Sequence, residues 1–404
     1  MRVLMFGWEF PPFRAGGLAT ATMGLVKGLL RNRVDVTLVV PFAASDAPLP
    51  GLRLVSAPRL ALRRLDTLLS PYTSAAAYLA ERARYDPPGG RGPSAVYGPD
   101  LFAEVDRYAT LAAAIAADEP HDVIDTHDWL TFSAGRHARA ISGKPMVAHI
   151  HATELDRAAT GHANPAIFDR ERDGLHAADH VIANSHFLER RVVDDFGVDP
   201  ARVDVVHWGI DGPRVDPAAP VDRPLSRPVV LFVGRVTYQK GPRYFVDLAK
   251  RVAAFVPRAR FVIAGDGDAL PDTLDYAVDI GVADRILFTG GLSRTDIQRV
   301  YRLADVCVMP SVHEPYGLVA LESLRNGTPC IIPIGSGVAE VLENAIKVDF
   351  WDVDAMANAV VAMARYPALH TTIRERGLDE VSAQRFTLDE PARRTADVYR
   401  RLVR

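Results

Sequence analysis

The sequence contains little cysteine and no long apolar run. Of its 404 residues only Cys307 and Cys330 are cysteines, and each lies in a short apolar stretch. Two thiols cannot build a disulfide framework, so we expect buried thiols and a reducing compartment. No apolar run approaches the roughly 18 residues that a membrane-spanning helix needs. The opening residues, MRVLMFGWEFPP, are too weakly apolar for a signal peptide. We therefore predict a cytoplasmic protein without a transmembrane segment.

An excess of charge of either sign is also missing. The 47 basic side chains nearly balance the 50 acidic ones, which leaves a net charge of −3. This balance gives no electrostatic reason to expect a nucleic-acid partner. A hydrophobic content of 48% and a charged content of 24% are ordinary for a globular protein. The length favours about two domains, while the oligomeric state is not indicated.

Short apolar runs alternate with longer helical patterns throughout the chain. Solidly apolar strands that alternate with helices are typical of parallel sheets covered on both faces. The sequence therefore predicts an α/β fold with doubly wound, Rossmann-like sheets. The expected strands lie at 2–6, 35–40, 123–127, 145–151, 180–185 and 203–207, and then at 229–234, 260–265, 285–290, 306–311, 330–334 and 345–349.

A proline-rich stretch, residues 211–228, interrupts this alternation and is typical of a linker. We therefore predict a first domain at 1–210, a second at 229–388 and a final helix at 389–404. The pattern does not decide which domain that helix joins. Residues 41–110 also break the rhythm, and such a long excursion is either a cap that faces the substrate or a simple elaboration of the fold.

The candidate functional residues of the first half follow its predicted strands, because parallel sheets bind ligands at the carboxyl ends of strands. Gly16 and Gly17 precede a helix, where backbone N–H groups can bind an anion, although a flexible turn is the alternative. Asp128 and Trp129 follow one strand and could hold hydroxyl groups, or could be structural. His151 ends the next strand, whereas His149 is expected to be packed in the core. No third ligand stands at metal spacing, so we expect no zinc site.

Two features of the second half suit a phosphorylated sugar. Arg235 and Lys240 follow the strand at 229–234 and could bind a diphosphate, unless they are ordinary surface cations. The stretch EPYGLVALE places Glu314 before a turn and Glu322 in the following helix. The amides of Tyr316, Gly317 and Leu318 would lie at that helix's N-terminus, which attracts anions. Carboxylates accept hydrogen bonds from vicinal hydroxyls, so together these groups suggest a nucleotide sugar.

In these residues the chain resembles the retaining glycosyltransferases of the two-Rossmann-domain (GT-B) type. The resemblance rests on WEFPPFRAGGLA, HDW, HIH, VGRVTYQKG and EPYGLVALE, and covers nearly the whole chain. The sequences of these motifs are most similar to those of glycogen and starch synthases. The resemblance implies two domains that face each other across a cleft. It also implies front-face transfer, in which the donor phosphate takes the acceptor proton and neither a metal nor another cofactor is required.

The resemblance also implies a role for each matching residue. Arg235 and Lys240 would bind the diphosphate and stabilise the leaving group, and Glu314 would contact the transferred sugar. The amides of Tyr316, Gly317 and Leu318 would bond sugar or phosphate, Glu322 would hold the ribose, and Gly16 and Gly17 would touch the diphosphate. His151 would hold the primary hydroxyl of the sugar, while Asp128 and Trp129 would meet the acceptor. In one departure, Trp208 stands where the family often has asparagine.

We therefore predict a hexosyltransferase that uses a nucleotide sugar and a carbohydrate acceptor. Transfer of glucose from ADP- or UDP-glucose to an α-glucan is the first expectation. A UDP- or GDP-sugar with a small-molecule or lipid acceptor is the alternative. A nucleotide-sugar epimerase and a sugar-binding protein without catalysis are more remote. A dinucleotide oxidoreductase lacks support, because no GxGxxG follows the first strand.

Overall fold

The computed structural model describes residues 1–8, 17–41, 52–56, 101–158, 163–211 and 228–403. The chain divides into two compact units. The first joins residues 1–208 to 388–404, and the second covers 209–387. The last helix therefore belongs to the first unit, a question that the sequence pattern leaves open. In the described part of the chain, no helix is long and apolar enough to cross a membrane.

The first unit is built on a parallel sheet with the strand order β3-β2-β1-β4-β5-β6-β7. Every residue of the central strands β4 and β5 is buried, as expected for parallel strands covered on both faces. The strands are β1 (Arg2–Phe6), β2 (Asp35–Val40), β3 (Arg53–Ser56), β4 (Val123–His127), β5 (Met146–Ile150), β6 (His180–Ala183) and β7 (Val203–Val205).

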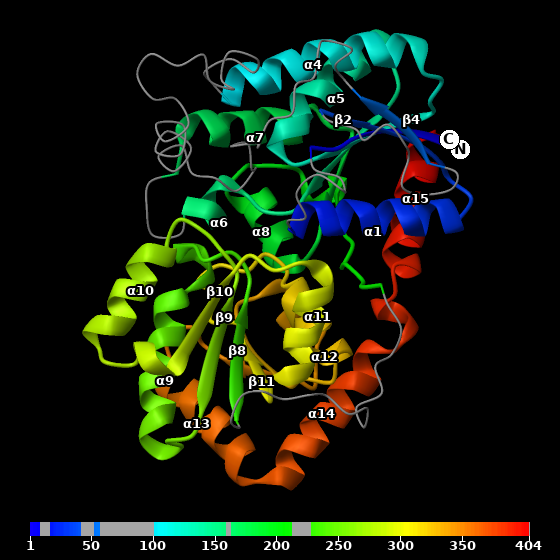
Figure 1. Ribbon diagram of the computed structural model, residues 1–404. Helices are drawn as coiled ribbons and strands as arrows, with labels where there is room; N and C mark the ends of the chain where they lie inside the picture. Colours follow the sequence, from blue (N-terminus) through cyan, green and yellow to red (C-terminus); the bar gives the residue numbers. More distant parts are fainter. Residues whose placement is uncertain (9–16, 42–51, 57–100, 159–162, 212–227, 404) are drawn as a thin grey trace, which may run out of the picture. The chain divides into compact units, whose positions relative to one another are not determined.

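Helices cover both faces of this sheet. Figure 1 shows α4, α5 and α7 on one face, and α1 and α15 on the other. Side-chain caps begin two of the helices, since Asn164 accepts the Ala166 N–H before α7 and Ser185 accepts the Leu188 N–H before α8. The helices are α1 (Gly17–Arg31), α4 (Leu101–Asp118), α5 (Trp129–Ser142), α6 (Glu154–Ala158), α7 (Pro165–Ala177), α8 (His186–Asp194) and α15 (Asp389–Val403), with a 3-10 turn at Pro200–Arg202.

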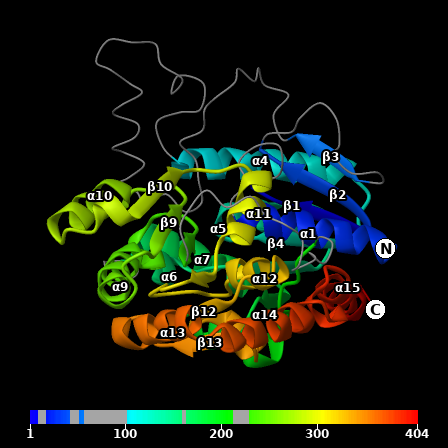
Figure 2. The same ribbon diagram turned by 60° about the horizontal axis from the view of Figure 1, so that its bottom comes forward.

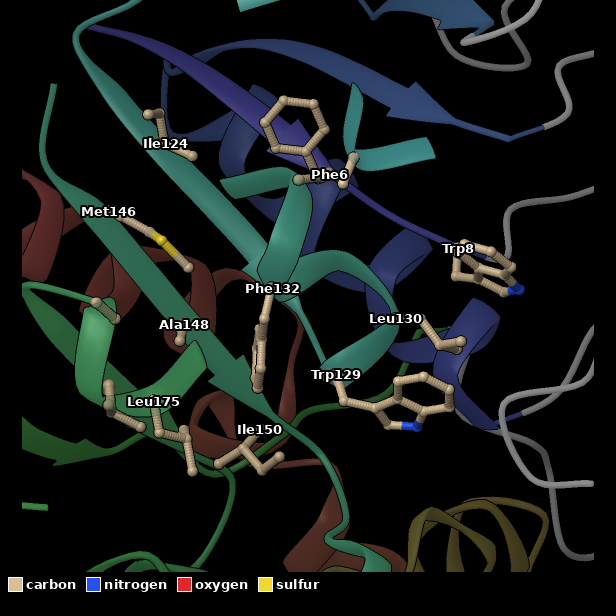
Figure 3. Packing of buried hydrophobic residues seen from close by; sticks show 14 of the residues in the cluster. Phe6, Trp8, Ile124, Trp129, Leu130, Phe132, Met146, Ala148, Ile150 and Leu175 are labelled. Atoms are coloured by element: carbon tan, nitrogen blue, oxygen red, sulfur yellow. The ribbon is translucent and has the colours of Figure 1, made fainter. Parts of the chain in front are cut away.

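The core of the first unit lies between its sheet and α5. Figure 3 shows Phe132 of α5 lying over β5, beside Ala148 and Ile150. A Cβ atom at Gly174 of α7 would approach the Phe132 ring to 2.3 Å. Glycine at 174 therefore allows α7 to pack directly on α5.

The second unit is a parallel sheet with the order β10-β9-β8-β11-β12-β13. Its strands are β8 (Val229–Val233), β9 (Arg260–Ala264), β10 (Ile286–Gly290), β11 (Val306–Val308), β12 (Cys330–Pro333) and β13 (Ile346–Val348). Both cysteines are free and buried, as the sequence predicts.

Six described helices surround the second sheet. Figure 2 shows α13 and α14 following each other along one side of the unit, with α14 beside α12. The helices are α9 (Pro242–Phe255), α10 (Leu270–Asp279), α11 (Arg294–Leu303), α12 (Leu318–Arg325), α13 (Val353–Arg365) and α14 (Pro367–Val381), with 3-10 turns at Tyr238–Lys240, Ala283–Arg285, Gly337–Glu340 and Gln384–Phe386.

The two doubly wound parallel sheets confirm the predicted fold class. All twelve expected strands are present, but β3 was not expected, because it lies within the excursion at 41–110. Most of that excursion and nearly all of the predicted linker at 211–228 lie outside the described residues, so their predicted roles stay predictions.

The contact between α1 and α15 depends on a glycine and gives a stability prediction. A Cβ atom at Gly28 would lie 2.4 Å from the Leu388 carbonyl oxygen and 2.6 Å from the Ala392 Cβ. Gly28→Ala should therefore push α15 away and destabilise the first unit by about 1–3 kcal/mol, despite alanine's better helix propensity. Thermal unfolding measures the effect. Gly335→Ala is the control, since nothing lies within 4 Å of a Cβ atom there. Equal midpoints for the two variants would contradict the prediction.

Candidate functional site

The strand order of the second sheet places two loops side by side. β8 lies between β9 and β11, so the order along the chain reverses between β8 and β11. Ligands of open parallel sheets bind at such a reversal, beyond the carboxyl ends of the strands. The loop after β8 carries Arg235 and Lys240, and the loop after β11 carries Glu314. The fold thus brings the predicted cations and the first predicted carboxylate to one edge.

Backbone contacts hold the two loops together. The Val312 N–H donates to the Gln239 carbonyl oxygen at 2.9 Å. Gly241, which precedes α9, has a φ of 66°, and a Cβ atom there would lie 2.0 Å from the Pro310 carbonyl oxygen. Only glycine fits this approach, because another side chain would suffer both a strained backbone and a clash.

Lys240 and Glu314 form a direct ion pair at this edge. The Lys240 Nζ donates to Glu314 Oε2 at 2.7 Å, and the Ser311 hydroxyl donates to the same oxygen at 3.0 Å. Glu314 is only 7% exposed, whereas the Lys240 side chain keeps 21% of its surface. Arg235 is partly buried and directly follows Gly234 at the end of β8. The supporting role of Ser311 was not predicted from the sequence.

The turn before α12 supplies backbone N–H groups to the same edge. α12 begins at Leu318, and Gly317 before it has a φ of 113°, a conformation that favours glycine. Tyr316 is buried, and its carbonyl oxygen accepts the Val338 N–H at 2.7 Å. The first N–H groups of a helix have no partner within the helix and attract anions. The amides of Tyr316, Gly317 and Leu318 therefore lie at the N-terminus of α12, as the sequence predicts.

Glu322 lies in the second turn of α12 and pairs with a different side chain from Glu314. The Tyr301 hydroxyl of α11 donates to Glu322 Oε2 at 3.1 Å. Burial raises the pKa of Glu322, while the Tyr301 hydrogen bond and the Arg294 charge oppose that shift. The two carboxylates of EPYGLVALE thus have separate surroundings. Tyr301 is a site residue that the sequence did not reveal.

The first sheet reverses its order beside β1, between β1 and β4. Gly17 begins α1 after β1, while Gly16 lies outside the described residues. Asp128 follows β4 and has φ 60° and ψ 172°, a region that residues other than glycine rarely adopt. Its Oδ1 accepts the His151 N–H at 2.7 Å, and its own N–H donates to the His149 carbonyl oxygen at 2.9 Å. The strained Asp128 therefore ties the end of β4 to the end of β5.

The Asp128 carboxyl is buried, and its environment changes its titration. Burial raises the pKa of Asp128 to about 6, although the Arg157 charge and the hydrogen bond from the His151 N–H favour the ionised form. Within the described residues, Oδ2 of Asp128 has no hydrogen-bond partner. The carboxyl thus has one oxygen engaged in the loop and one that is buried without a hydrogen-bond partner among the described residues.

Trp129 lies in the core rather than at the surface. Its side chain is 1% exposed, and its ring centroid lies 5.8 Å from that of Phe102 (Figure 3). This placement favours a packing role, with the ring fixing the start of α5. Nε1 of Trp129 has no hydrogen-bond partner among the described residues, so the acceptor contact predicted for Asp128 and Trp129 stays a prediction.

His151 lies at the end of β5 among aromatic rings. Its ring stacks on Trp208, with centroids 5.2 Å apart and planes inclined by 15°. The His127 ring meets its edge, with Nδ1 of His127 2.9 Å from Nε2 of His151, and the Asn184 side-chain amide donates to the His151 carbonyl oxygen at 3.0 Å. Trp208, which departs from the family pattern, therefore shapes the surroundings of His151. Within the described part of the chain, no group of three side chains is arranged to hold a metal ion.

Comparisons with known proteins agree with both units. Residues 16–209 match the family described as glycosyl transferase 4-like domain, and residues 227–365 match glycosyl transferases group 1. A D-inositol 3-phosphate glycosyltransferase of Mycolicibacterium paratuberculosis is 31% identical over 317 residues, which cover 73% of this chain and 71% of that one. The chain belongs to the group 1, GT4-like glycosyltransferases. An uncharacterized glycosyltransferase of Methanocaldococcus jannaschii is 27% identical over 366 residues, covering 86% of this chain and 84% of that one.

Solved structures show that this glycosyltransferase has the GT-B fold. Sucrose-phosphate synthase from Thermosynechococcus elongatus matches with a TM-score of 0.75 and 21% identity, covering 99% of this chain and 98% of that one. Anabaena HepE in complex with UDP-glucose matches with a TM-score of 0.67 and 17% identity over the full length of both chains. The predicted family and fold are therefore confirmed, and the chain is a transferase enzyme.

The raised pKa of Asp128 predicts how stability depends on pH. Between pH 4 and about 6 the folded glycosyltransferase keeps a proton on Asp128 that the unfolded chain has lost, so stability falls as the pH rises. Asp128→Asn keeps the acceptor for the His151 N–H but cannot ionise. It should lack this fall, which amounts to about 1–3 kcal/mol. Chemical denaturation at pH 4.5 and 7.5 measures the difference. Other carboxyls titrate in both proteins, so parallel curves would contradict the assignment.

Proposed function

We propose that this glycosyltransferase moves a hexose from a nucleoside diphosphate sugar to a hydroxyl acceptor with retention of configuration. The observation that carries the proposal is the Lys240–Glu314 pair, 2.7 Å apart at the reversal point of the second sheet. A cation and a carboxylate there suit a ligand that carries both phosphate and hydroxyl groups. A bound diphosphate would share the Lys240 ammonium with Glu314 and leave the carboxylate to accept from sugar hydroxyls.

The second unit would supply most of the donor contacts. Arg235 and Lys240 would bind the diphosphate and stabilise its growing charge as the sugar leaves. The amides at the start of α12, from Tyr316 to Leu318, would add fixed dipoles at the same position. These groups can compensate the leaving-group charge, so the proposal requires neither a metal nor another cofactor. Glu322 would accept from the ribose hydroxyls, because it has one oxygen beyond the bond to Tyr301.

The first unit would supply groups for the sugar and the acceptor. His151 would form a hydrogen bond with a hydroxyl of the transferred sugar, and the primary hydroxyl is the first candidate. Asp128 would orient the acceptor hydroxyl through Oδ2, which has no hydrogen-bond partner among the described residues. Gly16 and Gly17 would approach the diphosphate at the start of α1.

For the donor we propose UDP-glucose first and ADP-glucose second. Structures similar in fold contain UDP, or UDP-glucose itself. For the acceptor, the names of the relatives favour a small phosphorylated polyol or sugar, since they include a D-inositol 3-phosphate glycosyltransferase. An α-glucan is the second candidate, because the sequences EPYGLVALE and HDW resemble the corresponding motifs of glycogen synthases.

A matrix of donors and acceptors tests this proposal. UDP-, ADP- and GDP-glucose would each be incubated with inositol phosphate, fructose 6-phosphate, glycogen or no acceptor, and nucleotide release would be measured. We expect the fastest release with UDP-glucose and a phosphorylated small molecule. The anomeric proton of the product, observed by NMR, reports whether configuration is retained. An α-linked product from an α-linked donor supports the mechanism, and a β-linked product contradicts it.

The role of Lys240 gives a kinetic prediction. Lys240→Met removes the cation from the leaving group and should lower kcat by about 100- to 1000-fold, as the loss of one charge-stabilising donor does elsewhere. Lys250→Met is the matched control, because Lys250 is an exposed lysine of α9 and its loss should leave kcat unchanged. Circular dichroism checks the fold of both variants. Turnover by the Lys240 variant at the wild-type rate would remove Lys240 from the mechanism.

The role of Glu322 gives a different kinetic signature. Glu322→Gln keeps an acceptor for the Tyr301 hydroxyl but loses the charge that strengthens hydrogen bonds from ribose. The donor KM should rise about tenfold, with kcat little changed, because ribose binding is the same in the ground and transition states. Glu375→Gln on the exposed face of α14 is the control. A fall in kcat with an unchanged KM would argue for a role in the chemical step.

A further inference from the structure

A buried chain of polar side chains lies beneath His151 and has no role in the function proposed above. Asp125 and His127 belong to β4 and are 0% exposed. Burying such polar side chains costs free energy unless other polar groups interact with them. Tyr399 of α15 reaches them from the far end of the sequence, 274 residues from Asp125. This series of buried polar side chains leads from Tyr399 through Asp125 and His127 to His151.

Asp125 is the centre of this chain. Tyr399 donates its hydroxyl proton to Asp125 Oδ2 at 2.6 Å. The same oxygen lies 3.4 Å from His127 Nε2, and Oδ1 lies 3.3 Å from His149 Nε2. These are electrostatic contacts, because neither Nε2 atom has a hydrogen-bond partner among the described residues. Burial opposes ionisation of Asp125, yet the adjacent His149 and His127 rings and the Tyr399 hydroxyl bring its pKa below the ordinary value. Asp125 is therefore an anion that faces two imidazole rings.

The position of one anion decides where the protons sit. A carboxylate 3.4 Å from His127 Nε2 disfavours a lone pair and favours a proton on that nitrogen, which leaves the lone pair on Nδ1. His127 Nδ1 lies 2.9 Å from His151 Nε2. A hydrogen bond at that distance needs one proton, and His151 must provide it from Nε2. Burial keeps the pKa of His151 well below its ordinary value, so the ring is neutral and its Nδ1 is an acceptor.

We propose that Asp125 and His127 are positioning residues that hold His151 as the tautomer protonated on Nε2, so that its Nδ1 accepts from a hydroxyl of the donor sugar. Tyr399 donates the hydrogen bond that holds Oδ2 of the Asp125 carboxylate. The inference about the sugar rests on the proposed function, whereas the assignment of the tautomer does not. Hydrogen bonding of this kind commonly fixes the tautomer of a functional histidine from behind.

The surroundings of His151 also fix its orientation. Trp208 stacks on the His151 ring with an inclination of 15°, and His127 meets the ring edge to edge through the 2.9 Å contact between His127 Nδ1 and His151 Nε2. Its N–H donates to Asp128 and its carbonyl oxygen accepts from Asn184. His151 is 7% exposed, and among the described residues its Nδ1 has no hydrogen-bond partner. One acceptor atom is therefore held in a fixed direction, which favours a ligand hydroxyl that donates.

Nitrogen NMR of the histidine side chains tests the tautomer without substrate. In protein labelled with ¹⁵N-histidine, His151 is identified by the signals that His151→Gln removes. We expect a protonated Nε2 and an unprotonated Nδ1 on His151, with a coupling across the hydrogen bond from Nε2 to an unprotonated Nδ1 of His127. A proton on His127 Nδ1, a doubly protonated ring, or no coupling would overturn the proposal.

His127→Phe tests the consequence, because it keeps an aromatic ring at the edge of His151 but removes the Nδ1 acceptor. With UDP-glucose, kcat/KM should fall about tenfold, the usual effect of losing one positioned hydrogen bond. With UDP-6-deoxyglucose, which lacks the primary hydroxyl, wild type and variant should be equally active. Asp204→Asn is the control, because Asp204 pairs with His180 and Arg401 and does not contact the buried polar side chains from Tyr399 to His151. This substitution should change neither the activity nor the His151 signals.

The outcomes separate the two ideas. If wild type transfers from no donor, the proposed function fails, and the NMR result still decides the tautomer. If His127→Phe loses activity equally with both donors, the link from His151 to the primary hydroxyl is wrong. If the variant does not fold, the wild-type spectrum alone confirms or overturns the tautomer.

Discussion

The reversal of strand order in each parallel sheet is the constraint on which both candidate sites depend. β1 and β4 in one unit, and β8 and β11 in the other, are adjacent parallel strands, so the two strands of each pair end at the same carboxyl edge. Every predicted site residue that the structure describes follows one of these strands or β5, which is the neighbour of β4. Sheet topology therefore gathers side chains that are distant in sequence, and the loops need only local devices to aim them.

Those local devices are unusual backbone conformations, and they are positioned where two loops touch. Gly241 and Gly317 have positive φ values. Gly241 lets the Pro310 backbone approach closely, and Gly317 lies against the side chains of Met309, Val338 and Glu314. Asp128 adopts a similar rare conformation without being glycine, which costs about 1–3 kcal/mol. The same residue holds the His151 N–H and bears the raised pKa. Strain and burial at one position are expected where a side chain serves a ligand rather than the fold, which supports the role proposed for Asp128.

The sequence was sufficient for twelve strands, for the fold class and for the positions of Lys240 and Glu314 after strand ends, because apolar runs and strand ends can be read locally. It did not predict that Lys240 and Glu314 form an ion pair. It could not predict β3, since a short edge strand within an irregular excursion leaves little periodic signal. Nor could it place Trp129 in the core, because a tryptophan after a strand end suits a binding site equally well. Ser311 and Tyr301 escaped notice because their roles depend on which loop or helix lies opposite, and the chain itself gives no local signal of that.

The buried anion in the first unit shows why the C-terminal helix belongs there. α15 is strongly polar on its outer face, so a helix of its composition gains stability mainly through the face it buries. That face includes Tyr399, the hydrogen-bond donor for Asp125, and the Ala392 methyl group packed closely against Gly28. Without Tyr399 the Asp125 carboxylate would lack its shortest hydrogen bond, and a buried carboxylate with poor bonding takes up a proton. A neutral Asp125 would no longer select one tautomer of His127. Docking of the last helix and the protonation pattern at His151 are thus linked through a single carboxylate.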